Sequence, residues 1–137
     1  MAARSGKPRR VFILGGGAAL GAHQAGALDH LVGRGIVPDA IIGSSVGIVN
    51  ALLYASGGAE LALKSWRELN SLQVLIGPSI FHNPLLGNSL MSMDRLVRWV
   101  ERTVDFERVF ESPLRLEFVV LDLSDGQACL RGNRTES

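Results

Sequence analysis

A five-residue turn, Gly43-Ser44-Ser45-Val46-Gly47, lies between an apolar run and a helix-like stretch. The run Ala40-Ile41-Ile42 is typical of a buried strand, and residues 46–56 have helical character. A serine at a sharp strand-to-helix turn is the arrangement called a nucleophile elbow. The serine backbone in such an elbow is strained, so its neighbours must be small, and glycine has no Cβ to clash. The pattern predicts that the Ser45 hydroxyl leaves the sheet near the positive N-terminal end of the following helix.

A second small-residue turn follows the apolar run Val11-Phe12-Ile13-Leu14. It is Gly15-Gly16-Gly17-Ala18-Ala19-Leu20-Gly21, and it leads into a helix-like segment over 22–32. A glycine-rich turn between a strand and a helix presents free backbone N–H groups to an anion. Beside an activated serine, such donors can form an oxyanion hole, each lowering the reaction barrier by roughly 3 kcal/mol. A tight turn that binds nothing explains the same residues.

The same glycines leave a nucleotide- or phosphate-binding α/β module open as an alternative. The fingerprint G-x-G-x-x-G fails, because Leu20 stands three residues after Gly17, although the looser spacing of Gly15, Gly17 and Gly21 is present. No acidic residue closes the second strand, where a ribose would be held, and Ser44-Ser45 stands there instead. A Walker A loop is excluded, since the chain has no Gly-Lys-Ser or Gly-Lys-Thr.

Together, the two turns resemble those of the patatin-like phospholipase family. The matching stretches are residues 15–28 and 43–51, with weaker similarity at 65–69, 83–86 and 118–123. The resemblance therefore covers nearly the whole chain. It implies a three-layer α/β/α fold with a mostly parallel sheet. It also implies a serine acyl hydrolase that acts on a lipid ester or phospholipid and needs no cofactor.

Carried over by position, the resemblance makes Ser45 the nucleophile of a Ser–Asp dyad. The backbone N–H groups that would form the oxyanion hole belong to Gly16, Gly17 and Ala18. The glycines that support the two motifs are Gly15, Gly21, Gly43 and Gly47. The chemistry implied is acyl transfer from the lipid ester to the serine and then to water. The sequence contains no cluster of metal ligands.

The chain departs from the family pattern in two places. The family usually has Arg or Lys where Leu20 stands, so a positive charge near the predicted oxyanion hole is missing. The family's base is an aspartate in an Asp-Gly-Gly or Asp-Gly-Ala motif, well after the strand that matches Phe118–Leu123, and neither motif occurs here. We therefore expect a domain that is incomplete at its C-terminus, lacks the dyad aspartate and has little activity alone. A non-catalytic fragment that associates with lipid is a third hypothesis.

Other residues are poor substitutes for the missing base. Asp125-Gly126 directly follows the strand that ends at Leu121-Asp122-Leu123, and Gln127 comes next. We therefore interpret Asp125-Gly126 as the turn of a hairpin. A Ser–Asp–His order is not available, because His82, the only histidine after Ser45, precedes every later aspartate. His23 and His30 lie seven residues apart on the first predicted helix, and we interpret them as surface histidines.

Composition limits the classes of protein that this chain can belong to. Its 137 residues allow one domain with one core, and 47% hydrophobic residues are enough to build it. A net charge of +1 gives no reason to expect a nucleic-acid partner. A single cysteine, Cys129, permits no disulfide within the chain and is consistent with a reducing compartment. Without a signal peptide or an uninterrupted apolar stretch of about 20 residues, we expect a cytoplasmic protein, peripheral to membranes at most.

Two segments favour peripheral contact with a membrane. Residues 1–9 form a basic arm that could touch anionic headgroups, each charge contributing about 1 kcal/mol, although a solvated tail explains it as well. Residues 74–88 combine turn signals with apolar residues. They predict a loop that lines an acyl groove, touches a membrane or simply packs as an irregular connection.

Apolar periodicity and turn residues predict one domain over 10–137. Strands are expected at about 10–14, 39–42, 115–122 and 127–131, and helices at about 19–33, 46–56, 59–70 and 89–103. Gly57-Gly58 separates the second and third helices. The alternation of strands and helices implies a parallel sheet covered on both faces, with the active site at the carboxyl ends of the first two strands.

Overall fold

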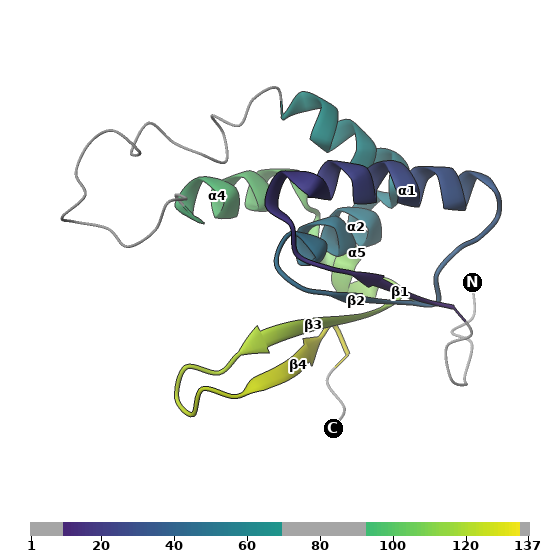
Figure 1. Cartoon of the computed structure of the whole chain (residues 1–137). Helices are drawn as coiled ribbons and strands as arrows, with labels where there is room; N and C mark the ends of the chain where they lie inside the picture. The colour runs from purple at the N-terminus through teal and green to yellow at the C-terminus, as the bar shows by residue number, and fades with distance from the viewer. Residues whose placement is uncertain (1–9, 70–92, 135–137) are drawn as a thin grey trace.

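The computed structural model describes residues 10–69 and 93–134. These residues form a four-stranded sheet with helices packed against it (Figure 1). The predicted basic arm at 1–9 and the predicted loop at 74–88 lie outside the described residues.

The sheet contains β1 (Val11–Leu14), β2 (Ala40–Gly43), β3 (Arg115–Leu121) and β4 (Ala128–Gly132), which lie across it in this order. The first three strands are parallel, and β4 pairs antiparallel with β3. Leu14 at the end of β1 lies beside Gly43 at the end of β2. The turns that follow these two strands therefore leave the sheet at the same edge. The predicted α/β class, mostly parallel sheet and terminal hairpin are confirmed.

The helices connect the parallel strands. The 3-10 turn η1 (Ala18–Leu20) leads into α1 (Gly21–Gly33), which links β1 to β2. The described residues between β2 and β3 include the helices α2 (Val46–Glu68), α4 (Met93–Thr103) and α5 (Phe106–Glu111). The helix α5 was not predicted from the sequence, and it is only six residues long. Its start is marked by Asp105, whose carboxylate accepts a hydrogen bond from the Arg108 N–H, an ordinary N-cap signal.

A kink divides α2 into two helical segments. Gly57 (φ −151°) and Gly58 (φ +77°) have non-helical backbone angles, so the predicted break at this glycine pair is confirmed. In a straight helix, the 16 positions from Asn50 to Trp66 would span about 24 Å. The indole N–H of Trp66 instead donates to the Asn50 side-chain oxygen at 2.6 Å. The kink therefore folds the second segment of α2 back along the first.

The described helices lie on one face of the sheet (Figure 1). Both crossovers step in the same direction, from β1 to β2 and from β2 to β3. Right-handed crossovers of this kind place their helices on the same side. The opposite face carries Val11 and Ile13, which are 43% and 77% exposed. Among residues 10–69 and 93–134 no helix covers that face, so the second helical layer of the prediction is not part of the described structure.

The hydrophobic core lies between the helices and the covered face of the sheet. Leu28 on α1, Leu53 on α2, and Ile41 and Leu116 on the sheet are its largest fully buried apolar side chains. Each contributes about 1.5–3 kcal/mol through burial. This core joins α1, α2 and the ends of the strands into the unit that carries Ser45.

Among the described residues, α2 is the one helix long and apolar enough to cross a membrane by length and composition. Half of its apolar window is buried inside the fold. Because the kink at Gly57–Gly58 also divides it, we interpret α2 as the central helix of this core.

Candidate active site

Ser45 lies at the turn between β2 and α2 and has a strained backbone. Its angles are φ +52° and ψ −125°. Among the described non-glycine residues, only Ser45 and Ala18 have positive φ. Such a conformation costs of order 1–3 kcal/mol and persists only where the surrounding structure imposes it. Ser45 is exposed, and its side chain makes no cap hydrogen bond to α2, so the helix N-terminus does not engage its hydroxyl.

The two glycines of the elbow are required by close backbone packing. A Cβ on Gly43 would lie 2.9 Å from the carbonyl carbon of Gly47, and a Cβ on Gly47 would overlap the carbonyl group of Leu14. The N–H of Ser44 donates to the Leu14 carbonyl at 3.0 Å. These contacts tie the elbow to the end of β1, where the glycine turn begins.

The glycine turn lies directly beside Ser45. A Cβ on Gly16 would lie 3.2 Å from Ser45 Cβ and 3.8 Å from Ser45 Oγ. Gly17 has φ +156°, a backbone conformation that residues with side chains rarely adopt. Within residues 10–69 and 93–134, no backbone hydrogen bond outside the helices and strands uses the N–H of Gly16 or Gly17. The fold thus brings the exposed Ser45 beside Gly16, whose N–H is not used in such a bond.

The other glycines of this turn have different surroundings. A Cβ on Gly15 would meet nothing within 4 Å. A Cβ on Gly21 would lie 2.5 Å from the Trp66 ring and 2.6 Å from Val46 Cγ2. Gly21 is therefore needed for the close packing of α1 on both segments of α2.

A buried polar network holds the glycine turn, and the sequence analysis did not single it out. Asn50 is fully buried on α2, and its side-chain oxygen accepts the Trp66 indole N–H at 2.6 Å. Its amide nitrogen donates to the Gly21 carbonyl and to Gln24 Oε1, both at 2.9 Å. Gln24 in turn donates to the Gly15 carbonyl at 2.7 Å. The signal in the sequence was an asparagine among apolar helix residues, since a buried amide must find partners.

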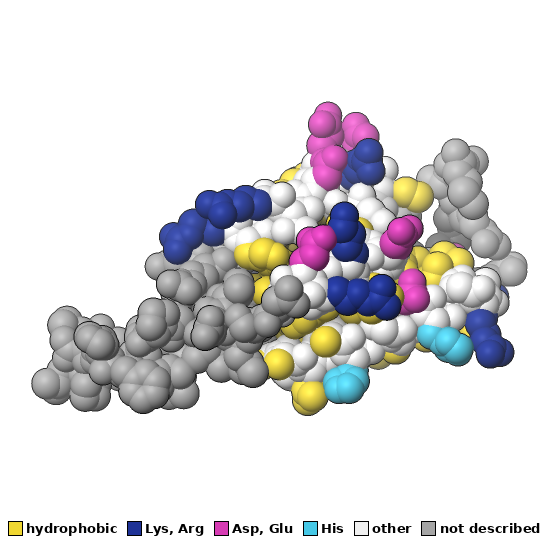
Figure 2. Space-filling view, turned by 90° about the horizontal axis from the view of Figure 1, so that it is seen from above, with side chains coloured by type: hydrophobic (Ala, Val, Ile, Leu, Met, Phe, Trp, Pro, Cys, Tyr) yellow, Lys and Arg dark blue, Asp and Glu magenta, His cyan; other side chains and the backbone are white. Residues whose placement is uncertain are grey.

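The histidines of α1 lie on the outer surface of the helical face. His23 and His30 are both exposed, as predicted from the sequence, and Figure 2 shows histidine side chains on this surface. His82 lies outside the described residues.

The turn between β3 and β4 uses its aspartates internally. Asp122 Oδ1 accepts the Ser124 hydroxyl at 2.6 Å and the Ser124 N–H at 2.9 Å. These two hydrogen bonds lower the pKa of Asp122, which makes its carboxylate a weaker base. Asp125 Oδ1 accepts the Gln127 N–H at 2.9 Å, and Gly126 has φ +72°. The prediction that Asp125-Gly126 is a hairpin turn is confirmed.

A surface cavity of about 360 Å³ lies beside the kink of α2, away from Ser45. Ser56 in its wall is eleven residues beyond Ser45, roughly 16 Å along the helix. Two of its charged lining residues, Asp105 and Arg108, form an ion pair at 3.3 Å. We place the candidate site at the elbow, because the strained, exposed Ser45 lies beside Gly16 there. The described part of the chain contains no group of His, Cys, Asp or Glu suited to hold a metal ion.

The fold and this site define an α/β domain with a nucleophile elbow. A strained serine follows β2 and a glycine turn follows β1, at the carboxyl edge of the sheet where such domains bind ligands. The chain belongs to the patatin-like phospholipase family, whose model matches residues 12–135. Comparison with curated proteins and with solved structures gave no match. Membership assigns the chain, at the level of the family, to lipid acyl hydrolases of the phospholipase type.

Proposed function

We propose that this chain carries the nucleophile and the oxyanion hole of a serine-dependent lipid acyl hydrolase. Ser45 Oγ attacks the ester carbonyl carbon, and the carbonyl oxygen becomes an oxyanion. This oxyanion accepts hydrogen bonds from the backbone N–H groups of Gly16, Gly17 and Ala18. A general base takes the Ser45 hydroxyl proton and passes it to the ester oxygen, which leaves as the alcohol. Water then hydrolyses the acyl-serine, which releases the fatty acid and restores the Ser45 hydroxyl. The observation that carries this proposal is that the strained, exposed Ser45 lies beside Gly16. A Cβ on Gly16 would be 3.2 Å from Ser45 Cβ.

The sequence offers no strong candidate for the general base that would take the proton of Ser45. A Ser–Asp dyad needs a carboxylate within hydrogen-bond reach of the serine hydroxyl. Asp122 and Asp125 are engaged in the hairpin turn instead. Because a general base contributes about 10²–10⁴-fold, we propose that residues 1–137 alone hydrolyse lipid esters slowly or not at all.

Leu20 gives the rim of the proposed site an apolar character. Its side chain is 62% exposed, and its Cβ lies 3.3 Å from the Cβ position of Gly17. Where the family usually has a cation, an aliphatic side chain favours the acyl part of a lipid over an anionic group. A cytoplasmic location with peripheral membrane contact is part of the same proposal.

A fluorophosphonate probe tests the proposal without requiring turnover. Its phosphorus bonds to the serine oxygen, fluoride leaves with the bonding electrons, and the hydroxyl proton passes to solvent. We expect mass spectrometry of the labelled chain to find the adduct on Ser45, and Ser45→Ala to abolish labelling. A matched Ser44→Ala variant keeps Ser45 and should still be labelled. An adduct on Ser44, or undiminished labelling of Ser45→Ala, would remove Ser45 from the reaction.

The nucleotide-binding alternative is tested on the same protein. A panel of nucleotides in a thermal-shift assay should leave the unfolding temperature unchanged, since the turn lacks the acidic partner that holds a ribose. A shift that saturates with nucleotide would favour that alternative.

A further inference from the structure

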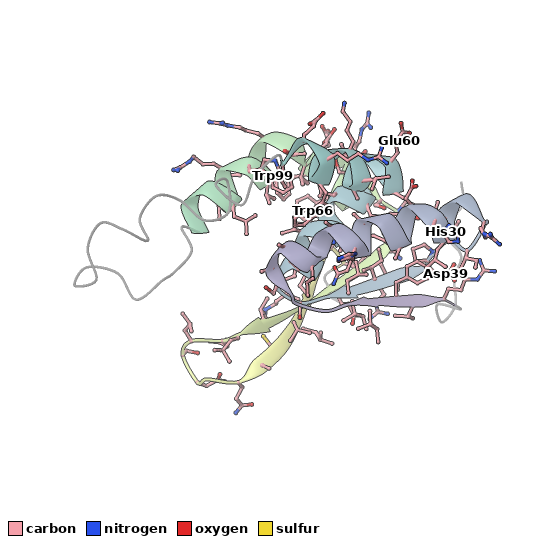
Figure 3. The ribbon with its side chains drawn as sticks, turned by 45° about the horizontal axis from the view of Figure 1, so that its top comes forward. His30, Asp39, Glu60, Trp66 and Trp99 are labelled. Carbon is pink, nitrogen blue, oxygen red and sulfur yellow. The ribbon has the colours of Figure 1, made fainter. Side chains whose placement is uncertain are left out.

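A chain of hydrogen bonds runs from the core to the glycine turn. The Trp66 indole N–H donates to Asn50, Asn50 donates to Gln24, and Gln24 donates to the Gly15 carbonyl, at 2.6, 2.9 and 2.7 Å. We call these four residues the Trp66 relay. It joins the second segment of α2, the first segment of α2, α1 and the turn after β1. Figure 3 shows Trp66 between the second segment of α2 and α1.

The direction of the relay is set at its indole end. An indole nitrogen can only donate, so Asn50 must turn its oxygen toward Trp66 and its N–H groups toward Gln24. Gln24 must then turn its oxygen toward Asn50, which leaves its own N–H group for Gly15. Reversing the Asn50 amide would set two donors against each other at a site with no solvent exposure. Among the described residues, no buried side-chain nitrogen or oxygen lacks a partner.

The last bond of the relay bears on the peptide that joins Gly15 to Gly16. The described residues contain no cis peptide, so the Gly15 carbonyl and the Gly16 N–H point in opposite directions across one plane. Without a tether, two adjoining glycines rotate this plane at little cost. With the carbonyl held by Gln24, the N–H is held as well, on a residue whose Cβ position is 3.8 Å from Ser45 Oγ.

We propose that Gln24, fixed by Asn50 and Trp66, is a positioning residue that orients the Gly16 N–H toward Ser45. The use of this N–H in catalysis rests on the function proposed above, whereas its orientation does not. Oxyanion donors work because they are aligned before the reaction begins, and losing one costs about 10²–10³-fold in rate. Misaligning a donor, rather than deleting it, should lower the reaction rate about tenfold or more.

Single substitutions separate the relay from the rest of the fold. Gln24→Met keeps the length of the side chain and removes its donor to Gly15 without adding charge. Trp66→Phe keeps an aromatic ring and removes the first donor of the relay. Matched controls are Gln127→Met in the exposed hairpin turn and Trp99→Phe on α4, neither of which belongs to the relay.

Three measurements are made on each variant of residues 1–137. The first is the rate of fluorophosphonate labelling of Ser45, the second is the ¹⁵N–¹H resonance of Gly16, and the third is the midpoint of urea unfolding. We expect Gln24→Met and Trp66→Phe to slow labelling about tenfold or more and to move the Gly16 resonance. The two controls should change neither quantity. If one relay variant does not fold, the other decides.

A merely structural network gives a different result. It lowers the midpoint of unfolding but leaves the Gly16 resonance and the labelling rate of the folded protein unchanged, and that result overturns the proposal. Slower labelling with an unmoved Gly16 resonance also overturns it. If wild-type Ser45 is not labelled at all, the proposed function fails by itself. The Gly16 resonance then decides alone: movement in both relay variants supports the proposal, and no movement overturns it.

Discussion

Replacing Gly21 by alanine tests the packing of α1 on α2 that holds the glycine turn in place. The added Cβ would lie 2.5 Å from Trp66 Cζ2 and 2.6 Å from Val46 Cγ2. Carbon atoms pack at about 3.5–4.0 Å, so α1 or its neighbours must move by about 1 Å. Neither neighbour yields easily, because Val46 is buried and Trp66 is anchored by its hydrogen bond to Asn50.

The expected loss follows from two opposing terms. Overpacking of this kind costs about 1–3 kcal/mol. The better helix propensity of alanine returns at most about 1 kcal/mol, and less at the first residue of a helix. We therefore expect Gly21→Ala to lower the free energy of unfolding by about 1–2 kcal/mol, which for a domain of this size is roughly 3–8 °C in Tm.

Gly26→Ala is the matched control for this prediction. Gly26 lies in the same helix, and a Cβ there would meet nothing within 4 Å. The same substitution should stabilise the protein by about 0.5–1 kcal/mol. Urea unfolding followed by circular dichroism measures both variants. Equal or greater stability of Gly21→Ala relative to wild type would refute the reasoning, because the close contact with Trp66 would then not exist in solution.

Three further predictions concern the site and the sheet. Gly16→Val should slow the labelling of Ser45 far more than it lowers the midpoint of unfolding. The reason is that the Cβ of the new side chain would lie 3.2 Å from Ser45 Cβ and crowd it. Equal, large losses in both quantities would show that the turn is purely structural. Residues 1–137 should hydrolyse a short-chain nitrophenyl ester weakly and should associate in size-exclusion chromatography. Ile13→Lys should reduce that association, because Ile13 is 77% exposed on the sheet face that no described helix covers. Vigorous turnover by a monomer would contradict this prediction. The pKa of Asp122 is lower in the folded state than in the unfolded chain, so its contribution to stability is complete above about pH 5 and is lost as the pH falls through the folded value. Asp122→Asn should therefore weaken the pH dependence of unfolding below about pH 4, and identical acid profiles for the two proteins would argue against it.

Local patterns predicted most of the elements, because each depends on neighbouring residues. The apolar runs before the two small-residue turns predicted β1 and β2, and Gly57-Gly58 predicted the break in α2. The turn at Asp125-Gly126 predicted the hairpin of β3 and β4. The short helix α5 escaped, since six residues carry too little periodicity to distinguish a helix from a loop.

The sequence by itself determined where the two small-residue turns lie. Gly43 and Gly47 are dictated by the elbow, because a Cβ at either position would collide with backbone. The tertiary structure alone decided which distant residues meet. Trp66 reaches Asn50 only because the kink reverses α2, and Gln24 reaches both Asn50 and Gly15 only because α1 packs on α2. Such contacts depend on how whole elements pack, and no spacing along the chain encodes them.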